Sequence, residues 1–272
     1  KAIFEQSWTD LSYLACLLTL PAENYLAEQM QVVDVVSIHQ ARTFVKRRLA
    51  EQLREHFKAL YLTSHKDESG ELSALPISKR RIKNVCLDYL SQLDSDESYQ
   101  LANAQFASAQ TMTDQIAALG AMVNSENPDK EKYLERFYQQ WQTEALVIDK
   151  WFSLQASSAQ TGTMAVVQLL AQHSAFDLKN PNRVRALVGA FSQANPIHFH
   201  AETGAGYQFL ADQVISLNAI NPQVASRMVG ALTQWRRFDP ERQALMKQQL
   251  ERIINTENVS KDVFEIASKS LN

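Results

Sequence analysis

Asn180–Phe238 reads NPNRVRALVGAFSQANPIHFHAETGAGYQFLADQVISLNAINPQVASRMVGALTQWRRF, and this stretch decides the fold. It contains the dipeptide Asn-Pro three times, beginning at Asn180, Asn195 and Asn221. Asn is a favoured helix N-cap because its side-chain oxygen accepts a hydrogen bond from a first-turn amide. Pro suits the next position because it has no amide hydrogen to leave unpaired. The stretch therefore predicts short helices that begin one after another along the chain.

Each of these predicted helices is apolar on one face only. The apolar positions follow the i, i+3, i+4, i+7 spacing, or close to it, which is typical of a helix packed on one side. They are Val184, Leu187, Val188 and Phe191; then Tyr207, Leu210, Val214 and Leu217; then Val224, Met228, Leu232 and Trp235. We expect these helices to stack side by side in chain order.

Three arginines lie at the borders of two of the apolar stripes. Arg183 and Arg185 border the first stripe and Arg227 borders the last, each roughly 90–110° from the stripe centre at about 100° per residue. At that angle a guanidinium can reach a groove between helices and pair with a ligand carboxylate, or it can form an ion pair within the fold. The residues alone leave both interpretations open for Arg185 and Arg227, and they favour the ion pair for Arg183.

The rest of the 272-residue chain continues the helical pattern. Asn127-Pro128 and Asp239-Pro240 repeat the cap-then-proline start, and the polar stretch 64–76 predicts an exposed loop. Gln31–Val36 is the only β-rich run. The remaining predicted helices are Thr9–Leu20, Pro21–Met30, Val36–Leu62, Ile77–Leu93, Glu97–Ser108, Thr111–Val123, Pro128–Trp141, Ala145–Gln155, Thr163–His173, Pro240–Ile254 and Lys261–Leu271. We predict an all-α fold, an irregular α-solenoid or superhelix of stacked antiparallel helix pairs, without a fixed sequence period.

Composition excludes several classes of protein. The net charge of -3 argues against a dedicated nucleic-acid binder. No run reaches the roughly 20 apolar residues of a membrane span. Two cysteines are too few for a disulfide framework, and Cys86 lies on an apolar helix face, which predicts a buried thiol. The chain begins at Lys1 with neither Met nor a signal peptide, so we expect a piece of a longer polypeptide.

No catalytic or metal-binding motif is complete. His198, His200 and Glu202 alternate along the chain, as zinc ligands on an extended segment would, but nothing else completes such a set and ordinary loop histidines are the preferred interpretation. Gly120–Asn124 (GAMVN) resembles the Gly-Ala-Met-Glu-Asn sequence with which certain zinc aminopeptidases hold a substrate's amino terminus. Here Val123 replaces the carboxylate and the segment continues a helix, so we interpret the match as coincidence.

Longer motifs carry a specific family resemblance. Asp149–Gln155 (DKWFSLQ), Asn180–Arg185 (NPNRVR), His200–Leu210 (HAETGAGYQFL) and Asn221–Arg227 (NPQVASR) resemble the C-terminal region of bacterial aminopeptidase N. Met112–Asp114 with Ala117–Leu119, and Arg81, Asn84, Cys86 and Leu87, extend the likeness toward the amino end. The resemblance covers nearly the whole chain and is densest after residue 145.

The resemblance implies that residues 1–272 are most of the helical C-terminal domain of a cytoplasmic zinc metallopeptidase. The zinc ligands and catalytic residues of such an enzyme lie in the amino-terminal part, so no catalytic residue, metal ligand or cofactor is assigned to this chain. In the family this domain packs on the catalytic domain, encloses the active site in a chamber and limits substrates to small peptides. The resemblance therefore favours Arg185 and Arg227 as peptide-binding residues. The alternative is a non-enzymatic helical-repeat scaffold that binds partner proteins, which the residues upstream would distinguish.

Overall fold

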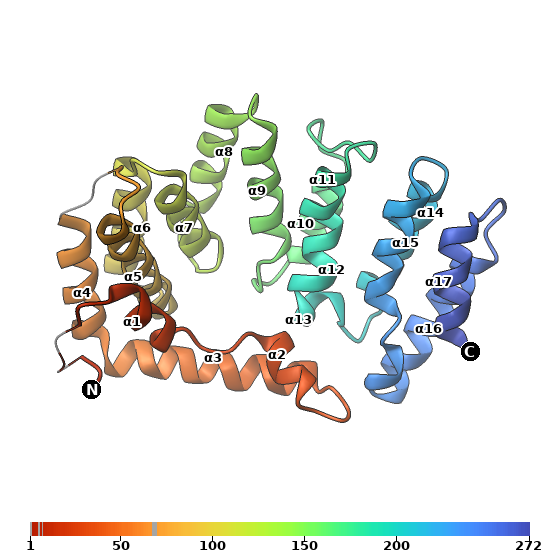
Figure 1. Ribbon diagram of the computed structural model, residues 1–272, viewed down its shortest axis with the longest axis horizontal. Helices are drawn as coiled ribbons and strands as arrows, with labels where there is room; N and C mark the ends of the chain where they lie inside the picture. The colour runs from red at the N-terminus through yellow and green to blue at the C-terminus, as the bar shows by residue number, and fades with distance from the viewer. Residues whose placement is uncertain (1, 5, 7, 67–69) are drawn as a thin grey trace. The chain divides into compact units, whose positions relative to one another are not determined.

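The computed structural model describes residues 2–4, 6, 8–66 and 70–272, and every regular element in these ranges is a helix (Figure 1). The chain divides into two compact units. Unit 1 comprises Lys1–Ala22 and Gln40–Phe137, and unit 2 comprises Glu23–His39 and Tyr138–Asn272. The predicted all-α class is confirmed.

Unit 1 is built around the helix α5, which packs against three of its neighbours, α4, α1 and α7, while α6 packs on α7. Its elements are α1 (Leu11–Leu18), most of α3 (Val35–Gln52), α4 (Arg54–Lys66), α5 (Ala74–Leu90), η1 (Ser91–Leu93), α6 (Asp96–Ser108), α7 (Met112–Val123) and the first part of α8 (Lys130–Trp141). In the core, the rings of Phe57 and Tyr89 stack 4.4 Å apart. Cys86 is fully buried, as predicted, and burial raises the pKa of its thiol to about 12.

Two local expectations for unit 1 are corrected. The single helix predicted for Val36–Leu62 is two helices, α3 and α4, which meet at Leu53 and run in different directions (Figure 1). No Gly or Pro marks this bend, and the packing of α4 along α5 accounts for it. The predicted loop 64–76 is shorter, because α4 continues to Lys66 and α5 begins at Ala74. Residues 67–69 of that loop lie outside the described residues.

Unit 2 follows the building rule predicted for residues 180–238. Its elements are α2 (Glu23–Glu28), α9 (Ala145–Ala156), α10 (Thr163–Leu170), α11 (Pro181–Val184), η2 (Arg185–Gly189), α12 (Ala190–Ala194), α13 (Pro196–Phe199), α14 (Ala205–Asn218), α15 (Pro222–Val229), η3 (Gly230–Leu232), η4 (Trp235–Arg237), α16 (Pro240–Ile254) and α17 (Lys261–Leu271). Helix α14 packs on α15 and α16 packs on α17, and the members of each pair run antiparallel (Figure 1). These pairs are the repeating element that the stripe pattern predicts.

Four of the five cap-then-proline starts are confirmed. The side chains of Asn180, Asn195, Asn221 and Asp239 each accept a hydrogen bond from a first-turn amide, and each is followed by a helical Pro. The fifth prediction is wrong, because α8 begins at Lys130 rather than at Pro128. The Asn127 side chain accepts from the Asp129 amide in a turn and donates to Asn103, so it closes that turn instead of capping a helix.

The apolar stripes form the core of unit 2, and all twelve residues of the three stripes are buried. Gly206 brings two helices together, because a Cβ at this position would lie 2.3 Å from the carbonyl oxygen of Phe199 at the end of α13. Gly204, directly before α14, has a φ of +70°, which glycine adopts without strain. The glycine spacing of the His200–Leu210 motif is therefore a packing requirement.

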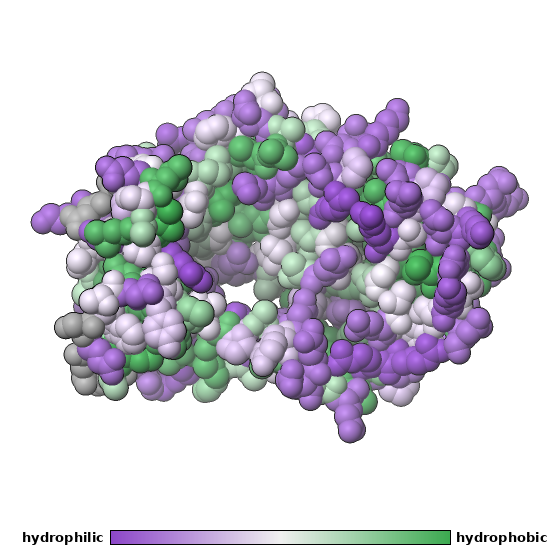
Figure 2. All heavy atoms as spheres, viewed as in Figure 1, coloured by the Kyte–Doolittle hydropathy of each residue, from purple (hydrophilic) through white to green (hydrophobic). Residues whose placement is uncertain are grey.

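Two details of unit 2 differ from the sequence patterns. The helix predicted to begin at Pro181, with the stripe from Val184 to Phe191, is not α-helical throughout, because Arg185–Gly189 within it is a π-helix. The β-rich run Gln31–Val36 contains no strand; it leads into α3, whose first residue is Val35. In the view of Figure 2, the exposed apolar residues form separate small areas among hydrophilic ones.

Candidate functional site

Arg185 lies at the first position of the π-helix η2. Asn180 caps the segment before it by accepting hydrogen bonds from the amides of Asn182 and Arg183. Short π-helical segments inside α-helices are rare and occur frequently at functional sites. The Arg185 side chain is exposed, and the one bond recorded for it is to the side-chain oxygen of Asn182 at 3.0 Å. Within the described part of the chain, its guanidinium has no carboxylate partner.

Arg227 lies in α15, whose start is capped by Asn221 through the Val224 amide. The side chain is exposed and makes no hydrogen bond or ion pair with any described residue. It borders a cavity of about 630 Å³ between α15, the turns that follow it, and α17. The other residues that line the cavity are Ser226, Gly230, Thr233, Arg236, Ile266, Lys269 and Ser270. The charged side chains of this lining are all cationic.

The segments that carry these two arginines approach each other at Gly189. A Cβ built on Gly189 would lie 3.7 Å from the Cβ of Arg185 and 4.0 Å from the sulfur of Met228, the residue after Arg227. Both contacts are ordinary van der Waals distances. The structure therefore places Arg185 and Arg227 on neighbouring helical segments of one unit, both with guanidinium nitrogens available to a ligand.

Arg183 is different, as the sequence pattern favoured. Its side chain is 7% exposed and its Nε donates to Asp149 at 2.7 Å. The guanidinium also donates to the carbonyls of Ala175 and Ala145 and lies 5.0 Å from the centre of the Phe152 ring. With these partners Arg183 connects α11 to α9 and to the segment after α10, so it holds the fold together.

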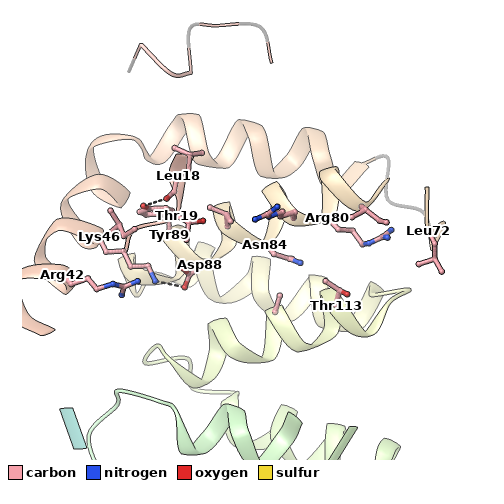
Figure 3. Close-up of a pocket in the computed structure, with 15 residues that line it drawn as sticks. Leu18, Thr19, Arg42, Lys46, Leu72, Arg80, Asn84, Asp88, Tyr89 and Thr113 are labelled. Carbon is pink, nitrogen blue, oxygen red and sulfur yellow. Dashed lines mark hydrogen bonds and ion pairs between the residues drawn. The ribbon is translucent and has the colours of Figure 1, made fainter. Parts of the chain in front are cut away.

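A second cavity, of about 670 Å³, lies within unit 1 along one face of α5 (Figure 3). We call it the α5 groove. Helix α5 contributes Ile77, Arg80, Arg81, Asn84, Val85, Asp88 and Tyr89 at helical spacing, and α3 contributes Arg42 and Lys46. Sequence reasoning did not single out this site. The signal that it passed over is the i, i+4 pair Arg42 and Lys46, which lies on a different side of α3 from Arg47 and Arg48.

The chain was compared with known proteins. Residues 1–272 match the family described as "Domain of unknown function (DUF3458_C) ARM repeats". The chain belongs to this family. It is 37% identical over 271 residues to Aminopeptidase N of Escherichia coli (strain K12), a match that covers 100% of this chain and 31% of that protein. It is 40% identical over 262 residues to Aminopeptidase N of Caulobacter vibrioides, a match that covers 96% of this chain and 30% of that protein.

A solved structure agrees with this assignment. The crystal structure of Legionella pneumophila aminopeptidase A in complex with aspartic acid matches with a TM-score of 0.90 and 31% identity, over 99% of this chain and 32% of that one. The chain therefore spans about a third of the length of these relatives. The resemblance to aminopeptidase N is confirmed, and the ARM-repeat description agrees with the predicted solenoid of helix pairs.

The alternating histidines of this ARM-repeat chain have local partners. The Nε2 atom of His198 lies 3.1 Å from the carbonyl oxygen of Ala159. His200 is hydrogen-bonded through Nδ1 to the hydroxyl of Tyr207 at 2.9 Å, and its ring stacks on Phe238. Burial, reinforced by the charge of Arg242, lowers the pKa of His200 to about 3, so the ring is neutral at pH 7. Among the described residues, no group of three His, Cys, Asp or Glu side chains could hold a metal ion.

Two further observations from the sequence concern the Gly120–Asn124 segment and the membrane span that no apolar run is long enough to form. Gly120–Val123 is the last turn of α7, and the Asn124 side chain caps it by donating to the carbonyl of Gly120 at 3.0 Å. This confirms that the segment is helical and not the extended strand that an amine-binding loop uses. In the ranges that the structure describes, no helix is both long enough and apolar enough to cross a bilayer.

Proposed function

We propose that residues 1–272 are most of the helical C-terminal domain of a zinc aminopeptidase. In this proposal the domain packs on the catalytic domain of the same polypeptide in the cytoplasm and forms a wall of the active-site chamber. It restricts access to small peptides and contributes Arg185 and Arg227 to peptide binding. The observation that carries the proposal is that relatives named Aminopeptidase N match this chain along 96–100% of its length, while the chain covers 30–31% of theirs.

The peptide-binding role of the two arginines rests on the exposure of their side chains and on the partners that their guanidinium groups have. The guanidinium of Arg183 is hydrogen-bonded to Asp149 and to two carbonyls. Arg185 and Arg227, in contrast, are exposed and lack a carboxylate partner among the described residues. A guanidinium can pair with the terminal carboxylate or a carbonyl of a peptide. In the Legionella relative the bound molecule is aspartic acid, an amino acid, which is the kind of product that an aminopeptidase releases.

The test is a comparison of long and short substrates in the longer enzyme that contains this chain. Arg185→Ala and Arg227→Ala should lower kcat/KM for tri- to pentapeptides by about ten-fold or more, since a charge-assisted contact is lost. Hydrolysis of single-residue chromogenic amides should change little, because these substrates extend little beyond the cleaved bond. The matched control is Arg252→Ala, which removes an exposed arginine that pairs with Asp212 on the surface.

The same measurements, together with the melting temperature, distinguish peptide binding from a purely structural role of the two arginines. If the two arginines only hold helices together, both substrate classes will lose activity equally and the melting temperature will fall. If neither melting nor kinetics changes, the arginines have no part in substrate binding. Sequencing the upstream reading frame tests the assignment itself, because the enzyme needs a zinc-binding motif there, and its absence would favour a protein-binding scaffold.

A further inference from the structure

We propose that the α5 groove of unit 1 binds an extended acidic peptide segment with carboxylates about four residues apart. This site is separate from Arg185 and Arg227, and it is carried by residues of unit 1 alone. The argument rests on the charge of the groove, on which of its cations are available, and on the distance between them.

The groove is locally cationic in a chain whose net charge is -3. Four cationic side chains line it and one carboxylate, that of Asp88, opposes them. Asp88 is already paired with Lys46 at 2.8 Å, as the dashed line in Figure 3 shows. A concave surface lined by one sign of charge concentrates the potential and attracts ligands of the opposite sign. The groove therefore suits an anionic ligand.

Two of the cations have donors to spare. Arg81 is exposed and makes no hydrogen bond or ion pair with any described residue. Arg42 uses its Nε to donate to the carbonyl of Pro21 at 2.8 Å, which fixes the guanidinium, while its two terminal nitrogens make no bond with any described residue. Arg80, by contrast, is 6% exposed and donates to the carbonyl of Glu71.

The two available arginines meet the groove at different points along its length. In Figure 3, Arg42 lies beside Lys46 and Asp88, whereas Arg81 is about two helical turns nearer the start of α5 than Asp88. From Arg81 to Tyr89, which lies beside Arg42, α5 advances about 12 Å at about 1.5 Å per residue. An extended peptide covers that distance in about four residues at about 3.3 Å each.

The lining also holds apolar side chains, and one of them, Val85, lies midway along α5 between Arg81 and Tyr89, beside the polar Asn84. In an extended peptide, side chains at i, i+2 and i+4 point to the same side. A segment with acidic residues at i and i+4 and an apolar residue at i+2 would therefore present a carboxylate to each arginine and an apolar side chain to the middle. This complementarity selects an extended acidic peptide over a compact anion such as phosphate.

The experiment uses fluorescence anisotropy with the full-length protein that carries this chain. The probe is a labelled peptide, acetyl-Glu-Ala-Leu-Ala-Glu-amide, whose blocked amino terminus keeps it from being a substrate of an aminopeptidase. We expect saturable binding that weakens with added salt. Replacing both Glu residues of the probe with Gln, or making the variant Arg81→Gln, should weaken binding by about ten-fold. Arg42→Gln should act in the same direction.

Two variants serve as controls. Arg48→Gln removes the same charge from α3, but Arg48 pairs with Glu51 outside the groove, so binding should not change. Arg252→Gln removes an exposed charge from α16, where Arg252 pairs with Asp212, so it should also leave binding unchanged, and a loss as large as that of Arg81→Gln would overturn the proposal. The proposal is equally overturned if the probe does not saturate, if Arg81→Gln and Arg42→Gln both bind like the parent, or if a short oligothymidylate binds more tightly than the peptide.

Discussion

Replacing Gly206 with Ala tests the close approach of α13 and α14 on which the core of unit 2 depends. A Cβ at this position would lie 2.3 Å from the carbonyl oxygen of Phe199, 2.8 Å from its Cα and 2.9 Å from its carbonyl carbon. Carbon atoms in favourable contact are about 3.5–4.0 Å apart, so the overlap with the two carbon atoms is roughly 0.6–1.2 Å. All three atoms belong to the backbone, so a rotamer change cannot relieve the clash.

The cost follows from how firmly Phe199 is held. Its ring is fully buried and makes edge contacts with the rings of Phe191 and Tyr207 at 6.0 and 5.3 Å. Overpacking a well-packed core costs about 1–3 kcal/mol, and a backbone clash belongs at the upper end, so we expect a loss of about 3 kcal/mol or more. At about 2–4 °C per kcal/mol for a unit of this size, the melting temperature should fall by roughly 6–12 °C.

Differential scanning calorimetry on the parent and on both glycine variants measures this directly. The control is Gly230→Ala, because a Cβ there meets nothing within 4 Å and the backbone is already right-handed helical. Removing a glycine at a compatible site stabilises by about 0.4–1 kcal/mol through the unfolded chain, so Gly230→Ala should melt at or slightly above the parent. The reasoning is refuted if Gly206→Ala melts within about 2 °C of the parent.

Two further predictions concern buried charge and pH. Arg183→Met should lower the free energy of unfolding of unit 2 by about 3–5 kcal/mol in urea denaturation, because Asp149 loses its buried partner, and adding Asp149→Leu should restore part of the loss. If Arg183→Met is neutral, the ion pair does not hold α11 to α9. For His200, the folded-state pKa of about 3 lies below the ordinary value of 6.5, so its contribution to stability is full above pH 6.5 and is lost as the pH falls toward 3. Between pH 7 and pH 5 the parent should lose about 2 kcal/mol more than His200→Gln, and equal pH profiles for the two proteins would contradict the buried neutral ring.

The sequence by itself determined the helices of unit 2 and where most of them begin. The signals are local: an Asn or Asp side chain reaches only its own first turn, and an apolar stripe repeats within one helix. Four of the five cap-then-proline starts are therefore N-caps, and the bounds predicted from Pro240 and Lys261 agree with α16 and α17. The sequence pattern also favoured an ion pair within the fold for Arg183, and the structure shows one with Asp149.

Only the tertiary structure decided features that depend on partners distant in the chain. No Gly or Pro marks the bend at Leu53. The bend follows from the packing of α4 on α5, which the local sequence does not show. In the sequence, Gly206 is one glycine of a motif. Only the folded structure shows that the backbone of Phe199 lies against it. The α5 groove combines Arg42 of α3 with Arg81 of α5, and residues so far apart in the chain share a cavity only after their helices have packed. Helix periodicity places a side chain on a face of its own helix, but which face meets which neighbour is set by the packing of the whole unit.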